Sequence, residues 1–457
     1  MRLATATLDR LSSTVERPGY DRDAQAVGIV HFGIGAFHRA HQAWYTDRAM
    51  DAGDRNWAIQ GVSLRSPGVA AQLNPQDGLY TLSERAPAGT RARLIGAVKG
   101  VLVASETPEA VINALAAPAT HIVTLTITEK GYCRTSDGSL DPELASDGSI
   151  YAFLGAGLAR RRAAGLPGLT ILSCDNLADN GRQLSRLMTE WLDRHAPDMR
   201  GWFERECACP STMIDRIVPA TTTGDREEIA AVLGLADEGA IVTEPFSQWV
   251  IEDRFAGPRP RWEAVGAQLV ASVAPYETAK LRMLNGAHSA LAYLGLKAGV
   301  AHVHEAVARP DLRDIASRLM RDEAAPTIQP APGQDLDRYR NDLLERFANT
   351  ALPHRLAQIA MDGSQKIPQR WLETLAARQA SGWRCPMILD ALAAWLGHIR
   401  GDNGPVEDPM ADTFATLWRT GDSAAVIDAL FGPGGRYEGV WRASEADRLT
   451  LLAFLGA

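Results

Sequence analysis

The chain has 457 residues, of which 46% are hydrophobic and 22% are charged, and its formal net charge is -8 at pH 7. These values are typical of a globular protein with two domains, and the negative charge disfavours nucleic acid and anionic membranes as partners. There are five cysteines and no apolar run near the ~20 residues of a membrane span, so we expect a cytoplasmic protein without disulfides or a signal peptide.

The first half of the chain alternates strand-like and helix-like segments. Short apolar runs predict strands at residues 27–32, 57–62, 92–104, 121–128 and 169–173. Amphipathic segments predict helices at residues 36–50, 108–116 (after a Thr107 cap), 149–164 and 178–195. The alternation is typical of an α/β fold with a doubly wound Rossmann-type sheet, to which the β-rich segments 240–243, 248–252 and 265–273 could add strands.

From about residue 275 the pattern becomes mainly α-helical. Helices are predicted at residues 276–294, 304–323, 335–347, 353–362, 368–380 and 387–399, with loops at 326–333 and 401–409. We therefore expect a Rossmann-type N-terminal domain at residues 1–274 and a mainly helical C-terminal domain at residues 275–457.

A pair of glycines directly follows the first predicted strand. In Gly33-Ile-Gly35, the first glycine permits a tight turn and the second lets a pyrophosphate approach the backbone at a helix N-terminus. His38 replaces the third glycine of the general fingerprint, and a tight turn without a ligand is the alternative interpretation. The second strand ends without an acid for the ribose, and Arg65 could meet a 2′-phosphate, so NAD and NADP both stay open.

Four residues at the start of the helical half carry groups suited to dehydrogenase chemistry. If residues 276–294 form one α-helix, Asn285 lies about 140° and His288 about 80° around its axis from Lys280. A lysine of lowered pKa can accept a hydroxyl proton, and an amide can stabilise an alkoxide-like oxygen. In the alternative interpretation, Lys280 and Glu277 form a surface ion pair and His288 is a core histidine.

Polar residues also end two predicted strands. Asn176 follows strand 169–173 within the run from Ser173, and the hydroxyl-rich run from Thr124 to Tyr132 ends another strand. In a doubly wound sheet the carboxyl ends of the strands face the ligand crevice, which would place Asn176 near the substrate or the nicotinamide. A strand end that only caps a turn is the alternative.

Several motifs between Gly33 and Arg370 match one known family, in order along the chain. They are GIGAFHRAHQA from Gly33, QDGLYTL from Gln76, TLTITEKGY from Thr124, SCDN from Ser173, IDRIVP from Ile214, EPFSQWVIED from Glu244, KLRMLNGAH from Lys280 and DGSQKIPQR from Asp362. With these motifs the chain resembles the long-chain mannitol dehydrogenase family, which includes mannitol 2-dehydrogenase, arabinitol dehydrogenase and fructuronate reductase (mannonate oxidoreductase).

The resemblance implies a metal-independent oxidoreductase with its site between a dinucleotide-binding domain and a helical domain. It implies that Lys280 is the general acid/base and that Asn176 and Asn285 hold the reacting oxygen. His288 would hydrogen-bond the substrate, and Glu277 would gate the proton path. The expected cofactor is NAD, with NADP not excluded, and the expected cofactor-binding residues are Gly33, Gly35, Ala36, Phe37, Arg65, Thr126 and Glu129.

Within the family, the segments VSLRSP from Val62, LNGAHSALAYLG from Leu284 and IAMDGSQKIPQR from Ile359 look most like fructuronate reductase. That resemblance implies interconversion of D-mannonate and D-fructuronate, and the substrate-binding residues it suggests are Asp215, Lys366 and Arg370. Oxidation of a neutral polyol such as mannitol or arabinitol is the alternative. Relatives suggest a monomer or a weak homo-oligomer.

Two other classes of protein fit the sequence less well. A zinc alcohol dehydrogenase would need a Cys/His ligand set, and the cysteines and histidines show no such spacing. A dinucleotide-binding sensor without activity would not need the intact set of Lys280, Asn285 and His288.

Overall fold

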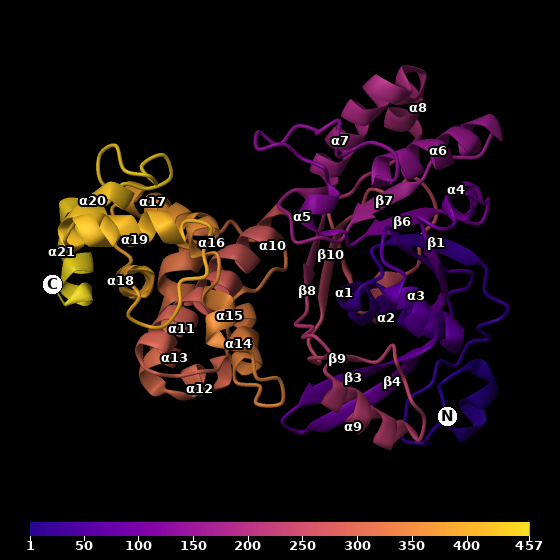
Figure 1. Cartoon of the computed structure of the whole chain (residues 1–457), viewed down its shortest axis with the longest axis horizontal. Coiled ribbons are helices and arrows are strands. Elements are labelled where there is room, and N and C mark those ends of the chain that lie inside the picture. Colours follow the sequence, from indigo (N-terminus) through magenta and orange to yellow (C-terminus); the bar gives the residue numbers. More distant parts are fainter. Residues whose placement is uncertain (457) are drawn as a thin grey trace. The chain divides into compact units, whose positions relative to one another are not determined.

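A computed structural model describes residues 1–456 of the chain (Figure 1). The chain divides into two compact units, Met1–Val273 and Ala274–Ala457. Within the described residues, no helix combines the length and the apolar character that a membrane span requires.

The first unit is built on a five-stranded parallel sheet with the strand order β5-β2-β1-β6-β7. The strands are β1 (Val27–Phe32), β2 (Ala58–Ser63), β5 (Val98–Val103), β6 (Ile122–Leu125) and β7 (Thr170–Ser173). The strand order reverses at β1, because β2 and β5 lie on one side of it and β6 and β7 lie on the other. This reversal creates the switch point at which doubly wound folds bind ligands.

Both faces of this sheet are buried, because each strand alternates its side chains between two hydrophobic cores. Val30 and Phe32 of β1 pack with the helices α4 (Pro108–Ala116), α6 (Ile150–Ala163) and α7 (Asn180–His195). Ile29 packs on the opposite side with α1 (Ala36–Ala40), α2 (Gln42–Asp51) and α3 (Gly68–Leu73). Figure 1 shows the two groups of helices on opposite sides of β6 and β1. The predicted doubly wound fold is confirmed.

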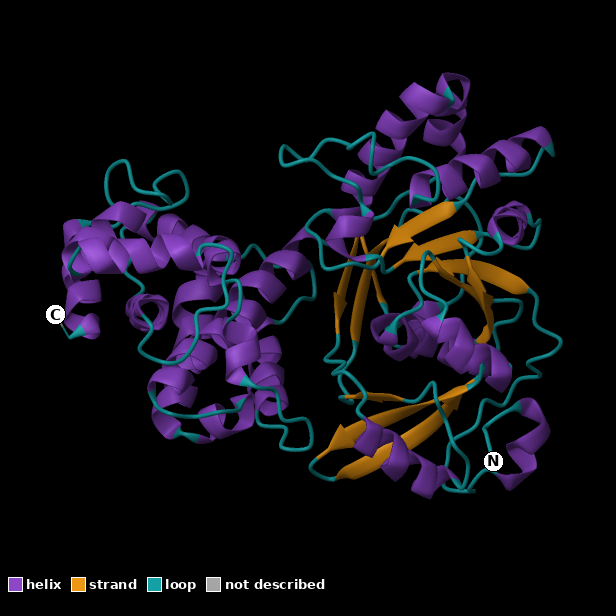
Figure 2. Ribbon diagram, viewed as in Figure 1, coloured by secondary structure: helices purple, strands orange, loops and turns teal. Residues whose placement is uncertain are grey.

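Two small sheets correct the expectation that the later β segments extend the main sheet (Figure 2). One has the order β4-β3-β9, with β3 (Tyr80–Ala86), β4 (Gly89–Ile95) and β9 (Ile241–Thr243). The other has the order β11-β10-β8, with β8 (Thr212–Asp215), β10 (Gln248–Glu252) and β11 (Gln268–Val270). The strand predicted at 92–104 is therefore wrong as one element: β4 pairs with β3, and β5 pairs with β2.

Two predicted elements of the first unit are shorter than expected. The predicted helix 36–50 breaks at His41, which has φ -121° and ψ -86°, into α1 and α2. The predicted strand 121–128 ends at Leu125, because Thr128 adopts a positive φ and opens the short helix α5 (Thr128–Gly131). Two further helices, α8 (Pro197–Glu206) and α9 (Thr223–Leu233), were not predicted from the sequence.

The second unit is helical around one hydrophobic core. Its centre is the nearly fully buried helix α18 (Pro386–Arg400), which packs against α11 (Gly286–Lys297) and α21 (Glu445–Leu455). The other α-helices are α10 (Ala274–Ala279), α12 (Val303–Ala308), α13 (Pro310–Arg318), α14 (Leu336–Phe347), α15 (Leu356–Ala360), α16 (Gly363–Ile367), α17 (Glu373–Ala380), α19 (Ala411–Thr420) and α20 (Ser423–Phe431).

Three of the long helices predicted here contain π-helical segments. These segments are η4 (Lys280–Asn285), η5 (Leu319–Ala324) and η7 (Pro368–Leu372), and η4 contacts both of the others. A π-helix bonds residue i to i+5, and such segments are frequent at functional sites. The predicted helices 276–294, 304–323 and 368–380 are therefore helical but not continuous α-helices.

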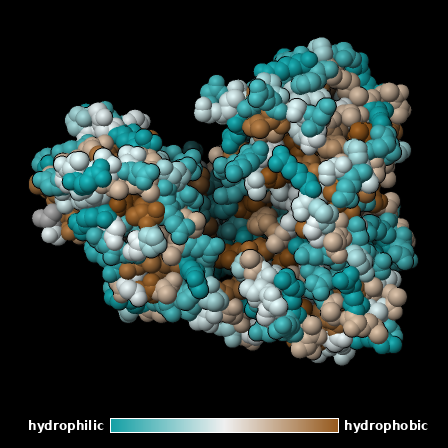
Figure 3. Space-filling view, viewed as in Figure 1, coloured by the Kyte–Doolittle hydropathy of each residue, from teal (hydrophilic) through white to brown (hydrophobic). Residues whose placement is uncertain are grey.

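Polar and apolar residues are interspersed over the visible face of each unit (Figure 3). Two of the exposed large hydrophobic residues are Val232 on α9 and Leu449 on α21. Scattered exposure of this kind is normal for a folded domain.

Candidate functional site

In the turn after β1, the first glycine, Gly33, has the conformation expected of a dinucleotide-binding turn. Gly33 has φ +88°, and a Cβ atom on it would lie 2.0 Å from the carbonyl oxygen of Thr126. The Gly33 N–H donates a hydrogen bond to the carbonyl of Val62 at 2.9 Å. The turn is thus wedged between the carboxyl ends of β2 and β6, and only glycine fits there.

Gly35 is a glycine for a different reason. Its φ is -81°, and the nearest atom to a Cβ placed on it would be 3.8 Å away. The packing of the chain itself therefore does not require a glycine at this position. The open space in front of Gly35 and the start of α1 at Ala36 fit the close approach of a ligand to the backbone. Phe37 follows, half-buried, with its ring stacked on His41.

His38, which stands in place of the third glycine, belongs to the interior of the first unit. It is fully buried and stacks on His31. His31 hydrogen-bonds the hydroxyls of Thr124 and Thr126, and the Thr126 hydroxyl donates to the carbonyl of Gly33 at 2.7 Å. Burial lowers the pKa of His31 to about 3, so this histidine is neutral and helps to hold the turn.

The end of β2 carries no acidic residue. The hydroxyl of Ser63 donates to the carbonyl of Ser66, and Arg65 is exposed on the turn between them. An exposed guanidinium at this place can meet the adenosine end of a nucleotide, as the sequence predicts.

The loops after β6 and β7 are joined by Asp175, a residue to which the sequence pattern assigned no role. Its carboxylate accepts hydrogen bonds from the N–H groups of Ile127 and Thr128 and from the Tyr132 hydroxyl. Burial raises the pKa of Asp175. Asn176 directly follows Asp175 and is exposed. The only sequence signal for Asp175 was its place in the SCDN motif, directly after a predicted strand.

The other predicted residues of the first unit lie in different surroundings. Thr126 is half-buried at the end of β6 beside Gly33, and Glu129 is exposed on α5. Asp215 is buried at the end of β8, outside the five-stranded sheet. The start of β8 nevertheless touches the end of β7, because the Thr212 hydroxyl donates to the carbonyl of Ser173 at 2.6 Å.

In the second unit, the π-helical segment η4 corrects the geometry predicted for the catalytic residues. It runs from Lys280 to Asn285, whereas the prediction assumed a regular α-helix. Because a π turn bonds residue i to i+5, residues five apart come to lie over one another. Asn285 therefore lies about one turn from Lys280 on the same side, which is a closer arrangement than the α-helical prediction gave. Glu277 precedes η4 on α10 and is half-buried, as is Lys280.

His288 lies one helical turn beyond Asn285, on α11, among aromatic and cationic groups. Its ring stacks on Phe347 at a centroid distance of 5.0 Å and meets His354 edge-on at 5.2 Å. Burial lowers the pKa of His288 well below its usual value, and the charges of His354 and Arg370 add to the effect. His288 is thus a neutral imidazole that can donate or accept a hydrogen bond.

Arg370 is a half-buried cation on η7 beside the same helix. Its guanidinium donates to the hydroxyl of Ser289 at 2.7 Å, and burial lowers its pKa to about 10. No ion pair joins Arg370 to a carboxylate within residues 1–456. Lys366 differs, since its ammonium donates to the carbonyl of Met361 and lies 3.7 Å from the Asp362 carboxylate.

Trp371 braces the junction between η4 and α11, a role that the sequence did not suggest. Its buried indole N–H donates to the carbonyl of Gly286 at 3.0 Å. A Cβ atom on Gly286 would lie 3.4 Å from the Arg370 carbonyl, so η7 packs closely at this point. The π register of η4 is therefore held from a segment far along the chain.

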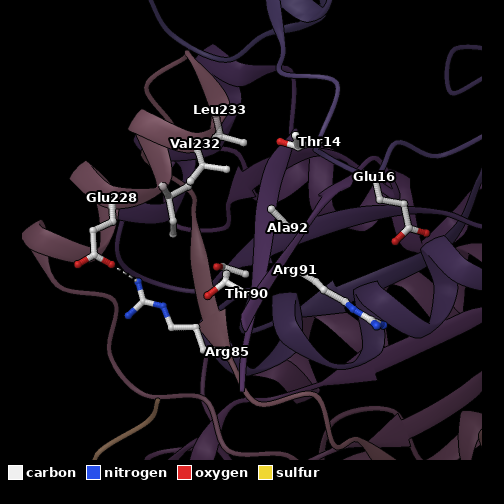
Figure 4. A pocket seen from close by; sticks show the side chains of 11 residues that line it. Thr14, Glu16, Arg85, Thr90, Arg91, Ala92, Glu228, Val232 and Leu233 are labelled. Carbon is white, nitrogen blue, oxygen red and sulfur yellow. Dashed lines mark hydrogen bonds and ion pairs between the residues drawn. The ribbon is translucent and has the colours of Figure 1, made fainter. Parts of the chain in front are cut away.

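In the first unit, a pocket of about 370 Å³ opens between the β3–β4 hairpin and α9 (Figure 4). It contains none of the predicted site residues. Arg85 points into it but pairs with Glu228 at 2.9 Å and with Asp225 at 2.6 Å. Elsewhere in the described chain, no three His, Cys, Asp or Glu side chains gather so as to hold a metal ion.

Comparison with known proteins identifies the family. Residues 27–264 match the Mannitol dehydrogenase Rossmann domain, and residues 272–437 match the Mannitol dehydrogenase C-terminal domain. D-mannonate oxidoreductase of Escherichia coli K12 is 40% identical over 92% of this chain and 91% of its own length. Mannitol 2-dehydrogenase of Pyrenophora tritici-repentis is 39% identical over 94% of this chain and 80% of its own length.

A solved structure gives the same answer. The ternary complex of Pseudomonas fluorescens mannitol 2-dehydrogenase with NAD and D-mannitol matches with a TM-score of 0.83 and 35% identity. The match covers 100% of this chain and 95% of that one. The chain therefore belongs to the mannitol dehydrogenase family of oxidoreductases.

Proposed function

We propose that this protein interconverts D-mannonate and D-fructuronate with NAD as its cofactor and without a catalytic metal ion. The observation that carries the choice of substrate is Arg370, a half-buried guanidinium without a carboxylate partner in the described chain, beside His288. The similarity to D-mannonate oxidoreductase agrees with this choice.

The residues after β1, β2 and β6 fit a dinucleotide. Gly33 and Gly35 would let the pyrophosphate approach the turn, with Ala36 and Phe37 at the start of α1. Arg65 would lie toward the ribose, and Thr126 and Glu129 toward the nicotinamide. The chemistry that NAD supplies when bound is the exchange of a hydride with a carbon atom.

Side chains of the protein would transfer the proton of the reacting alcohol and bind its oxygen. We assign Lys280 as the group that removes the hydroxyl proton in oxidation and returns it in reduction. Asn285, one π turn away, and Asn176 would donate hydrogen bonds to the reacting oxygen and stabilise its developing negative charge. Glu277 would pass the proton between Lys280 and solvent, and His288 would bind a substrate hydroxyl.

The substrate carboxylate is assigned to Arg370. A half-buried charge without an opposite charge is partly desolvated, and a bidentate Arg–carboxylate pair would offset that cost on binding. Lys366 is already committed to Met361 and Asp362, so we assign it a weaker role at the edge of the site. Asp215 is a third candidate for substrate binding, since its carboxylate could accept a hydrogen bond from a substrate hydroxyl group.

Oxidation of a neutral polyol to its 2-ketose is the second candidate function. It is favoured by the similarity to mannitol 2-dehydrogenases, at nearly the same identity as to D-mannonate oxidoreductase. Lys280, Asn176 and Asn285 would act in the same way, because the reacting group is again a secondary alcohol. Only the partner of Arg370 would change, from a carboxylate to a hydroxyl.

The experiment compares KM for D-fructuronate and D-fructose in Arg370→Gln. We expect KM for the sugar acid to rise by about tenfold or more, and KM for the neutral ketose to change by less than about threefold. Arg400→Gln is the matched control, because Arg400 is paired with Asp402 in the same unit. Equal rises of KM for both substrates in Arg370→Gln would remove the carboxylate from the proposal.

A further inference from the structure

Asp175 joins two loops that come from neighbouring strands of the five-stranded sheet. Its Oδ1 accepts from the Thr128 N–H at 2.9 Å, and its Oδ2 accepts from the Ile127 N–H at 3.0 Å. The hydroxyl of Tyr132, which is fully buried, donates to the same Oδ2 at 2.8 Å. These partners lie 43 to 48 positions away in sequence, so the contact is tertiary rather than local.

The turn that Asp175 holds is strained. Thr128 has φ +64°, a left-handed conformation that is unfavourable for a β-branched residue. Such a conformation persists only where surrounding contacts impose it, and the N–H groups of Ile127 and Thr128 both end on the Asp175 carboxylate. The hydrogen bonds to Asp175 therefore stabilise the strained conformation of Thr128.

The backbone of Asp175 is fixed as firmly as its side chain. Its carbonyl accepts from the Leu177 N–H at 2.9 Å and from the side-chain amide of Asn180 at 3.1 Å. The next residue, Asn176, is exposed at the carboxyl end of β7. A residue anchored on both sides in this way fixes the direction in which its neighbour leaves the sheet.

We propose that Asp175 is a positioning residue that locks the loop after β6 to the loop after β7, so that the Thr126–Glu129 segment and Asn176 keep fixed places. The proposal rests on the proposed function, in which that segment meets the cofactor and Asn176 meets the reacting oxygen. Asp175 would touch neither ligand. Its contribution is to set the distance between the residues that do.

The first test measures hydrogen exchange in the free protein. Asp175→Asn keeps the size of the side chain but turns an NH2 group toward one of the two N–H donors. Exchange of the amide that faces this NH2 group, Ile127 or Thr128, should then accelerate by about tenfold or more, because its acceptor is lost. Asp137→Asn is the matched control, since Asp137 also accepts hydrogen bonds from loop residues but is exposed at Thr135 and Ser139.

The second test is a rescue. Thr128→Gly removes the strain, because glycine adopts a positive φ without a steric cost. In the Asp175→Asn background it should restore at least about half of the lost kcat, although the amide that faces the NH2 group stays without its acceptor. In Asp175→Asn alone, kcat should fall by about tenfold or more with a smaller change in KM, and the deuterium isotope effect on kcat should rise as hydride transfer becomes limiting.

Each outcome decides a different point. Wild-type exchange of the Ile127 and Thr128 amides in Asp175→Asn would overturn the lock. Faster exchange with unchanged kcat and isotope effect would make Asp175 a structural residue only, and would overturn its role in positioning. If the wild-type protein turned over neither sugar acids nor polyols, the proposed function would fail, and the exchange rates would still decide whether the lock exists.

Discussion

Replacing Gly33 with alanine should destabilise the first unit. The new Cβ atom would lie 2.0 Å from the Thr126 carbonyl oxygen, and the residue would have to keep φ near +88°. The left-handed conformation costs alanine about 1 kcal/mol, and forcing the ends of β1 and β6 apart costs about 2 kcal/mol more. At about 2 °C or more per kcal/mol for a domain of this size, Tm should fall by about 6 °C or more.

Gly35→Ala is the matched comparison, two residues along the same turn. Its Cβ atom would meet nothing closer than 3.8 Å and its φ is ordinary, so Tm should change by less than about 1 °C. The methyl group would instead occupy the space assigned to the pyrophosphate. The Kd for NADH should therefore rise by about tenfold or more, which corresponds to about 1.4 kcal/mol.

Thermal unfolding followed by circular dichroism gives Tm for both variants, and titration of NADH fluorescence gives Kd. The two glycines should separate: Gly33→Ala loses stability, and Gly35→Ala loses affinity with its stability intact. A Gly35→Ala protein that binds NADH as tightly as the wild type would refute the assignment of this turn to the pyrophosphate. An unchanged Tm for Gly33→Ala would refute the geometry of the turn.

Three further predictions each concern one residue. Burial raises the pKa of Glu323 to about 7 from an ordinary 4.5, so the folded state binds the proton more tightly and the free energy of unfolding should fall by as much as about 3 kcal/mol as pH rises from 4.5 through 7. Denaturant unfolding at several pH values checks this, and a Glu323→Gln protein with the same pH dependence would contradict it. Trp371→Phe leaves the Gly286 carbonyl without its indole donor and should lower the free energy of unfolding by about 1–3 kcal/mol, whereas a loss below about 0.5 kcal/mol would show that the brace is unimportant. Lys280→Ala should abolish turnover with a nearly unchanged Kd for NADH, and retention of more than about a tenth of the wild-type rate would remove Lys280 as the general base.

The sequence predicted the central sheet well because buried parallel strands are continuous apolar runs. The run VGIVHF coincides with β1 from Val27 to Phe32. It predicted the β3–β4 hairpin poorly, because β3 mixes apolar residues with Ser83, Glu84 and Arg85 and pairs outside the main sheet. A polar strand of this kind carries little periodic signal.

The π-helical segment η4 was beyond what the local pattern could predict. Residues 276–294 satisfy the α-helical period, and the π register depends on packing with η5 and η7. The clearest support comes from Trp371, which binds the Gly286 carbonyl from 85 positions away. Sequence spacing placed Lys280 and Asn285 on one broad face, and tertiary packing brought them closer together.

Residue types were easier to predict than their surroundings. The sequence selected Arg370 as a cation for a carboxylate, but only the fold shows that it is half-buried and bonded to Ser289 while Lys366 is paired with Asp362. Asp175 is part of the SCDN motif that the sequence singled out. Its role depends on a turn 48 positions away, whose positive φ at Thr128 no local pattern indicates.

The most direct test of the account is the rate of NADH oxidation by the wild-type protein with D-fructuronate and with D-fructose. The two substrates present a similar ketone and differ in the carboxylate assigned to Arg370. We predict a value of kcat/KM at least about 100-fold higher for D-fructuronate, since a site built for a polar group rejects the analogue that lacks it. Reduction of D-fructose with equal or higher kcat/KM would contradict the sugar-acid assignment and place the protein among the polyol dehydrogenases.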